Sequence, residues 1–293
     1  DIDNRYIFGV TVFRNSGRTD SVKGGYRDGT LNLLQDIETE SIEISRQVLE
    51  KYSPEARIFP LVEEEEEVDL LEKIVEFPPL SEELSNKWTA KPYRELDRGN
   101  DRDRFVESQE DGDYPVYQGE NLYQYAYTPD FIDNLNPPSL WSVEEQKDPE
   151  ASAKRRIRGK NFRLLKRGIY EAFDGTGSQK GFVNELLKNN GRGELTDQDV
   201  LLDCKEYRII CRRIANSTNE RTLISSVVPK GVVSVDSTFT LRPFEVDPSK
   251  EDLSKEPLHD VYSRIFTDRE LFVTVGLINS IPFDFLMRTK INT

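Results

Sequence analysis

The chain is poor in the residues that most metal sites and catalytic triads require. It contains one histidine, His259, and two cysteines, Cys204 and Cys211, in 293 residues. A histidine-based triad or a histidine-rich metal site would depend on His259 alone, which argues against both kinds of site. A strand joining the two cysteines would hold them too far apart to form a disulfide, so we expect reduced thiols in a cytoplasmic protein.

Long apolar runs and phosphate-binding loops are also missing. The sequence has no signal peptide and no apolar run near 18 residues, so we expect no membrane-spanning segment. Neither GxGxxG nor GxxxxGK(S/T) occurs. GTGSQKG, residues 175–181, looks like a phosphate cradle but follows no apolar strand, so we interpret it as a loop. The first residue is Asp1 instead of Met, which favours a domain of a longer protein.

Positive charge is scarce overall but concentrated locally. The formal net charge is −14, which argues against attraction of nucleic acid to the whole surface. Residues 154–167, KRRIRGKNFRLLKR, nevertheless contain eight basic side chains, which could neutralise several phosphates. The alternative is a solvated loop whose basic residues pair with the many carboxylates of the chain.

The hydrophobic pattern indicates a globular chain that mixes strands and helices. Residues 5–13, RYIFGVTVF, alternate like a buried strand, and helical spacing predicts a helix over 41–52. Five glutamates precede an apolar helical pattern at 68–75, as expected for a helix start. Residues 207–215, 222–229 and 231–241 are predicted strands.

We therefore predict an α/β (mixed α+β) fold: a twisted mixed sheet with flanking helices and long loops. The polar stretch 97–113 suggests a boundary between two subdomains, 1–112 and 113–293. Thr267 to Glu270 fits a capping box, and we expect a long, kinked C-terminal helix over 268–290.

Arginines cluster in the stretch from Tyr207 to Thr222, YRIICRRIANSTNERT. Arg208 and Arg212 would share one side of a strand, and arginine forks suit guanine edges and phosphate oxygens. The alternative is that these arginines bond buried carboxylates or backbone carbonyls.

Two short patterns resemble enzyme motifs. NPPS, residues 136–139, lacks the aromatic residue of the NPPY motif of adenine methyltransferases, so a Pro-Pro turn is the better interpretation. Asp130, Glu145 and Lys147 fit a loose nuclease pattern that could bind Mg²⁺, which leaves a magnesium-dependent nuclease as an alternative. An acidic protein-interaction module is a second alternative, favoured by the net charge.

Five segments, in order, carry a resemblance that spans nearly the full chain: DIDNRYIFGVTVF, YRELDRGNDRDRF, PVYQGENLYQYAY, YRIICRRIANSTNERTLISSVVPKGV and GLINSIPFDFLMRTKI. Together they resemble the region C-terminal to the catalytic domain in large adenine-specific (N6) DNA methyltransferases. These include type IIG restriction-modification enzymes and related phage-defence methylases. PVYQG and the block from Arg212 to Thr222 are the most specific parts.

The resemblance implies a target recognition domain that binds double-stranded DNA and reads the bases around the adenine to be flipped. Residues 1–112 would connect to the catalytic domain of the parent chain, and 113–293 would recognise DNA. S-adenosylmethionine would bind the catalytic domain, so this chain alone is expected to hold no cofactor and to be inactive. We predict these DNA-binding residues: Lys154, Arg155, Arg156, Arg158, Lys160, Arg163, Arg208, Arg212, Arg213, Asn219 and Arg221.

Overall fold

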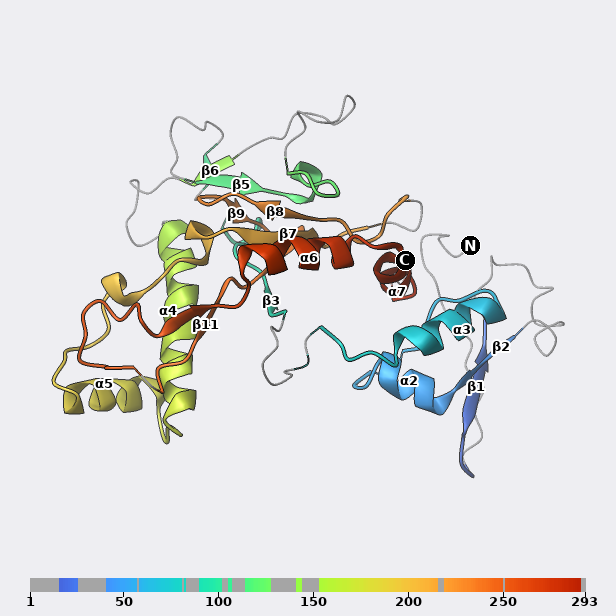
Figure 1. The fold of residues 1–293 in the computed structure, drawn as a ribbon, viewed down its shortest axis with the longest axis horizontal. Helices are drawn as coiled ribbons and strands as arrows, with labels where there is room; N and C mark the ends of the chain where they lie inside the picture. The colour runs from blue at the N-terminus through green and yellow to red at the C-terminus, as the bar shows by residue number, and fades with distance from the viewer. Residues whose placement is uncertain are drawn as a thin grey trace. The chain divides into compact units, whose positions relative to one another are not determined.

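A computed structural model describes much of the chain, in two compact units (Figure 1). The described residues are 16–25, 41–56, 58–80, 82, 90–101, 105–106, 114–127, 141–143, 153–215, 219–249 and 251–290. Unit 1 comprises Asp1–Glu82, Ala215–Leu223 and Ser280–Thr293; unit 2 comprises Glu83–Ile214 and Ile224–Asn279. The boundary predicted near residue 112 and the strand predicted at 5–13 lie outside the described residues.

Unit 1 is built around a two-stranded antiparallel sheet. Strand β1 (Ser21–Gly24) pairs with β2 (Ile42–Ser45), and α2 (Arg46–Tyr52), α3 (Glu65–Ile74) and α7 (Ile281–Arg288) complete the unit. The helix predicted over 41–52 begins only at Arg46, because Ile42 and Ile44 alternate and pair with β1. Ser45 caps α2 by accepting a hydrogen bond from Val48 N. The glutamate run does begin a helix: the Glu67 carboxylate accepts a hydrogen bond from Glu64 N at the start of α3.

Unit 2 contains a four-stranded antiparallel sheet in the order β3 (Pro92–Tyr93), β10 (Thr238–Leu241), β7 (Arg208–Arg212) and β8 (Ser225–Val228). The predicted neighbouring strands at 207–215 and 222–229 are thus confirmed as β7 and β8. Helix α6 (Asp268–Ile278) packs on β7 and β8, as Figure 1 shows. The side chain of Asn279, which follows α6, binds both backbone groups of Ser225 and ties the helix to the sheet.

A second sheet of unit 2 has the order β4 (Phe105–Val106), β6 (Trp141–Val143), β5 (Pro115–Tyr117) and β9 (Val233–Ser234). Its β5–β9 pair is parallel and its other pairs are antiparallel, so the sheet is mixed. A short 3-10 turn, η4 (Gly119–Asn121), follows β5. The pair β11 (Phe244–Val246) and β12 (Tyr262–Arg264) forms a separate antiparallel ribbon.

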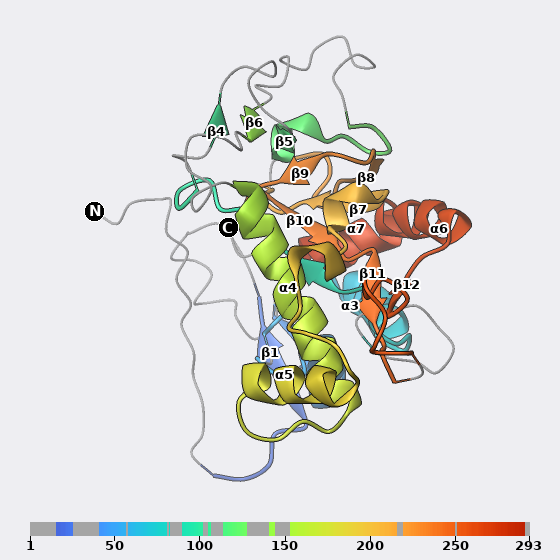
Figure 2. The same cartoon turned by 90° about the vertical axis from the view of Figure 1, so that its left-hand side faces the viewer.

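The longest described helix, α4 (Ala153–Ala172), crosses unit 2. Its amino-terminal end lies beside β9 and β10, and Ile157 joins Val116 and Val233 in one apolar cluster (Figure 2). Farther along, Leu165 and Ile169 pack with α5 (Gln179–Asn189) and the loop after η6 (Asp197–Asp199). A second 3-10 turn, η7 (Asp203–Lys205), leads into β7. The segment 154–167 is therefore helical and amphipathic.

The predicted α/β class is confirmed, with several small sheets where one was expected. The strand predicted at 231–241 is divided into β9 and β10 by a turn at Asp236 and Ser237. The C-terminal helix is also divided. Thr267 and Glu270 form the predicted capping box of α6, and Ser280 then caps the separate helix α7. Within the described part of the chain, no single helix could cross a membrane by length and apolarity; only α6 and α7 taken together pass that test.

Candidate nucleic-acid interface

Helix α4 divides its side chains between the core of unit 2 and its surface. Ile157, Asn161, Leu165 and Ile169, four residues apart, are buried. The helix carries eight basic residues and only one acidic residue, Glu171. Because a helix repeats every 3.6 residues, the basic residues at 160, 163 and 167 share one face away from the buried positions. We call Lys160, Arg163 and Arg167 the basic face of α4.

The basic side chains of α4 differ in how they are used. Arg158 forms an ion pair with Asp197, with Nη1 2.7 Å from Oδ2, and Arg167 pairs with Glu171 at 2.7 Å. Both pairs are partly or largely exposed, so each stabilises the fold only slightly. Arg163 is exposed and forms no hydrogen bond or ion pair with any described residue. Of the predicted phosphate-binding residues whose side chains the structure describes, Arg163 is therefore the most available.

Lys154, Arg155 and Arg156 lie in the first turn of α4, and their side chains are outside what the structure describes. Their predicted contact with DNA stays a prediction.

The loop 94–98 links the basic face of α4 to the end of β7. The Lys160 ammonium group donates to the Arg94 carbonyl at 2.6 Å and also to the Glu95 carbonyl. Farther along the same loop, Arg98 Nη1 donates to Gln118 Oε1 at 2.6 Å, and Arg98 N donates to Asp236 Oδ1 at 2.8 Å. A continuous series of contacts therefore joins helix α4, this loop, η4 and the turn between β9 and β10.

Two arginines, Arg212 and Arg213, lie at the end of β7, and the series of contacts reaches this end through Asp236. Arg213 is exposed, and its Nη1 donates to the Asp236 carbonyl at 3.3 Å. Arg212 is half-buried, and its guanidinium forms no hydrogen bond or ion pair with any described residue. A Cβ atom on Gly119 would lie 3.4 Å from Arg212 Cγ and 3.5 Å from Nε, so the arginine side chain lies against this glycine.

Two buried carboxamides flank Gly119. The Gln118 oxygen accepts from Arg98, and the Asn121 oxygen accepts from Gln118 N at 2.6 Å. The amide nitrogens of both side chains, Gln118 Nε2 and Asn121 Nδ2, have no acceptor among the described residues. An unpaired buried donor costs about 1–3 kcal/mol, so it requires an explanation. We call Arg98, Gln118, Asn121, Arg212 and Arg213 the β7-end patch.

The prediction that Arg208 contacts DNA is wrong, because this side chain is fully buried. Its Nη1 forms an ion pair with Glu95 and its Nη2 donates to the Val232 carbonyl. Burial acts to lower the pKa of Arg208, but the nearby Glu95 carboxylate outweighs it and the pKa is raised. Glu95 also accepts from Ser234 N at 2.8 Å and from its hydroxyl at 3.1 Å. Arg208 therefore holds the two sheets of unit 2 together.

Asn219 and Arg221 belong to unit 1. The Asn219 carbonyl accepts from Arg288 Nη2 at 3.0 Å, and Arg221 Nη1 lies 3.8 Å from the Asp284 carboxylate. Asp284 also accepts from the backbone N–H of Thr222 and of Leu223, both at 2.8 Å. These contacts shape the 219–223 segment, and the candidate interface consists only of unit 2 residues.

The other sequence patterns add no catalytic site to the described residues. Asp130, Glu145, Lys147 and the segment 136–139 lie outside the described residues, so the nuclease alternative stays untested. In the loop 175–181, the Ser178 hydroxyl accepts from Gly181 N at 3.1 Å and caps α5. His259 Nε2 lies 2.7 Å from the Gln198 carbonyl. No group of three or more potential metal ligands occurs among the residues that were placed.

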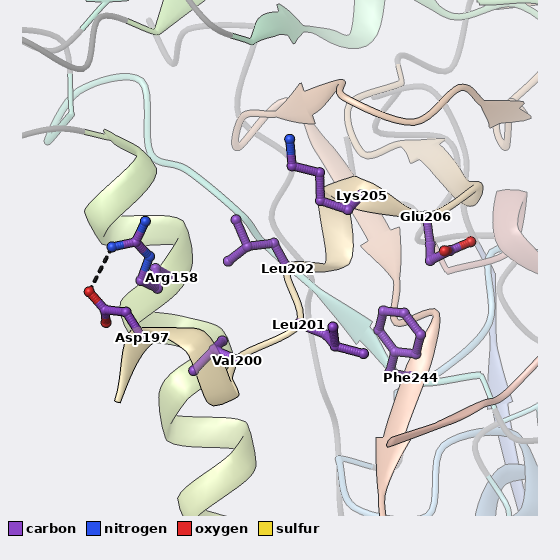
Figure 3. Close-up of a pocket in the computed structure, with 8 residues that line it drawn as sticks. All are labelled: Arg158, Asp197, Val200, Leu201, Leu202, Lys205, Glu206 and Phe244. Atoms are coloured by element: carbon purple, nitrogen blue, oxygen red, sulfur yellow. Dashed lines mark hydrogen bonds and ion pairs between the residues drawn. The ribbon is translucent and has the colours of Figure 1, made fainter. Parts of the chain in front are cut away.

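A pocket of about 300 Å³ lies beside the amino-terminal half of α4 (Figure 3). The Arg158–Asp197 ion pair stands at one side of it, and the Phe244 ring lines the other. Its remaining lining residues are Val200, Leu201, Leu202, Lys205 and Glu206. The pocket is open and mixes apolar and charged groups without a pair of catalytic groups in contact, so it defines no reaction.

Both free cysteines are buried, as expected for reduced thiols. Burial raises the pKa of the Cys204 thiol to about 11 and raises that of Cys211 as well, so neither is a reactive nucleophile. Comparison with known proteins gives no family: no protein-family model and no curated protein matches the chain.

Sequence reasoning missed Arg98, Gln118 and Asn121. These residues lie in RELDRG and PVYQGEN, which belong to the segments that carry the resemblance. The resemblance could have pointed to them, but it assigned no role to single residues. Sequence reasoning also missed that the Lys160 ammonium group donates hydrogen bonds to two backbone carbonyls, because residues 94 and 95 are far from Lys160 in sequence.

Proposed function

We propose that unit 2 binds double-stranded DNA through the basic face of α4 and the β7-end patch. The observation that supports this most is the series of contacts from Lys160 through the loop 94–98 to Asp236 and Arg213. It brings basic residues separated by more than a hundred positions onto one part of a chain whose net charge is −14. Arg163 and Arg212 have no partner among the described residues, so their charges remain available to phosphate oxygens or base edges.

The particular function that we propose is target recognition for an adenine-N6 DNA methyltransferase of a restriction-modification or phage-defence system in the cytoplasm. This step depends on the resemblance of the five sequence segments. The most specific of them, PVYQG and the block beginning at Arg212, contribute Gln118, Arg212 and Arg213 to the β7-end patch. PVYQG also supplies Gly119, against which the Arg212 side chain lies. The catalytic domain of the parent chain would supply the S-adenosylmethionine site and the catalytic motif, and this chain would supply DNA binding.

The acidic interaction module is the second candidate, and the net charge of −14 is the observation that favours it. The two functions differ in their response to salt. DNA binding through phosphates releases counterions, so its affinity falls steeply as salt rises.

Fluorescence anisotropy with a labelled duplex of random sequence tests the proposal over a range of NaCl concentrations. We expect log K to fall linearly with log[NaCl], and Arg163→Ala to make the slope shallower by about 0.9. Arg269→Ala is the matched control, because Arg269 is an exposed arginine on α6 of the same unit and lies outside both surfaces. A flat salt response, or no binding at low salt, would support the interaction module instead.

A further inference from the structure

We propose that Arg212 reads a guanine in the major groove, and that Gly119 positions it for this contact. This inference rests on the proposed function, because it names the base that the β7-end patch would recognise. It begins with the unusual state of Arg212. The residue is half-buried in a sheet, yet its guanidinium has no partner among the described residues.

The backbone and stem of Arg212 are fixed even though its charged group is free. Its N–H donates to the Ile224 carbonyl at 2.8 Å, and it pairs with Thr238 of β10. The side chain then runs along Gly119, where a Cβ would meet Arg212 Cγ at 3.4 Å and the Ser237 carbonyl at 3.3 Å. Gly119 N donates to the Ser237 hydroxyl at 3.0 Å, which holds the glycine in place. A base-reading arginine needs such an oriented stem, because a bidentate contact depends on the direction of the planar fork.

The two carboxamides that flank Gly119 are buried, and the oxygen of each already accepts a hydrogen bond. The oxygen of Gln118 is used by Arg98 and that of Asn121 by the backbone, which leaves their unpaired NH₂ groups. Bidentate recognition of adenine needs the donor and acceptor of an accessible carboxamide, and these two carboxamides are buried, so they do not provide it. Guanine presents two acceptors, O6 and N7, in the major groove, and arginine is its commonest partner.

A phosphate group also presents only acceptors, so phosphate contact is the rival role for Arg212. The two roles differ in sequence dependence. A phosphate contact contributes equally to every sequence, whereas a guanine contact contributes only where guanine stands at one position.

Selection from a random duplex library, followed by sequencing of the bound DNA, tests the inference with the full 293-residue chain. We expect the wild-type chain to enrich a motif with at least one required guanine. Arg212→Ala should make that position degenerate and weaken binding to the best duplex by about 5- to 150-fold, the equivalent of one good bidentate contact. Arg269→Ala should leave the motif unchanged.

Two further variants separate the effect of the planar guanidinium geometry from the effect of the positive charge. Arg212→Lys keeps the charge but loses the fork, so it should lose the guanine preference with an unchanged salt slope. Gly119→Ala keeps Arg212 itself and should lower the same preference by crowding its stem, again with an unchanged slope.

The outcomes distinguish failure of the inference from failure of the proposed function. If the wild-type chain binds no duplex or enriches no motif, sequence-specific DNA binding is refuted and the inference with it. If a motif appears but Arg212→Ala weakens all sequences alike and makes the salt slope shallower, Arg212 contacts phosphate. That result would overturn the inference and leave the proposed function standing.

Discussion

The two ends of strand β7 use arginine in opposite ways. Arg208 and Arg212 are four residues apart and lie on the same side of the strand. Arg208 is fully buried against Glu95, whereas Arg212 is half-buried and has no partner among the placed residues. The difference arises from neighbours distant in sequence: Glu95 and Val232 enclose the first arginine, and Gly119 leaves space beside the second. Position on a strand alone therefore does not decide whether an arginine serves the fold or a ligand.

The largest effect expected from this comparison is that of Arg208→Met on stability. Removing Arg208 leaves Glu95 buried without its countercharge, which should cost about 3–5 kcal/mol in the free energy of unfolding. Arg212→Met should change that free energy by no more than about 0.5 kcal/mol, because methionine keeps the apolar stem and the lost guanidinium has no partner among the described residues. Urea unfolding followed by circular dichroism measures both.

A double variant tests the assigned cause. Glu95→Gln removes the unpaired charge, so adding it to Arg208→Met should recover part of the lost stability. Equal stability losses for Arg208→Met and Arg212→Met would remove the contrast between the two ends of β7.

A second buried pair tests whether the contrast extends beyond β7. Arg192 Nη2 lies 2.5 Å from Asp199 Oδ1, and both side chains are buried. Burial acts to raise the pKa of Asp199, but hydrogen bonds from Arg192 and from the Thr196 and Leu258 backbones outweigh it. The pKa is thus held below its ordinary value of 3.8. Asp199→Asn should cost about 2–3 kcal/mol at pH 7.

The pH dependence of that cost follows from the direction of the shift. A lowered carboxylate pKa contributes stability that is complete above the ordinary value and is lost as pH falls through the folded-state pKa. The stability difference between wild type and Asp199→Asn should therefore shrink below pH 3.8. Urea unfolding at a series of pH values measures it; curves that stay parallel down to acid pH would show that the carboxylate charge contributes nothing.

The smallest effects concern the two sides of α4. A Cβ on Gly168 would lie 2.6 Å from Val246 Cγ1 and 3.0 Å from the Val246 carbonyl, so Gly168→Ala should cost about 1–3 kcal/mol. A Cβ on Gly159 meets nothing within 4 Å, so Gly159→Ala should stabilise by about 0.5–1 kcal/mol through helix propensity. Thermal unfolding of both variants measures the difference. If Gly159→Ala also destabilises the protein, the space beside Gly159 on the exposed side of α4 is not open to a methyl group.

Local sequence patterns predicted several elements correctly. The glutamate run starts α3, Thr267 and Glu270 cap α6, and the apolar stretches around Ile209 and Val227 form neighbouring strands. These features depend on residues within a few positions of one another. The division of 41–52 into β2 and α2 was missed, because Ile42 and Ile44 fit a helix and a strand equally until β1 pairs with them.

The candidate site was predictable only in part. Arg212 and Arg213 were expected to face DNA, and both belong to the β7-end patch in the structure. Arg208 looked equivalent to Arg212 because strand spacing places them on one side, and only Glu95, 113 residues away, distinguishes them. Arg98 and Gln118 were not singled out, since their contact joins a loop and a turn of two different segments.

By itself, the sequence determined the mixed α/β class, the acidic overall charge and the concentration of basic residues at 154–167, because these follow from composition and short-range periodicity. The tertiary structure decided which of the basic residues are available. A charge buried in protein must be paired, and its partner is supplied by whichever distant segment the fold places beside it. On one strand, arginine therefore forms a structural ion pair at Arg208, whereas at Arg212 its guanidinium pairs with no residue that the structure describes.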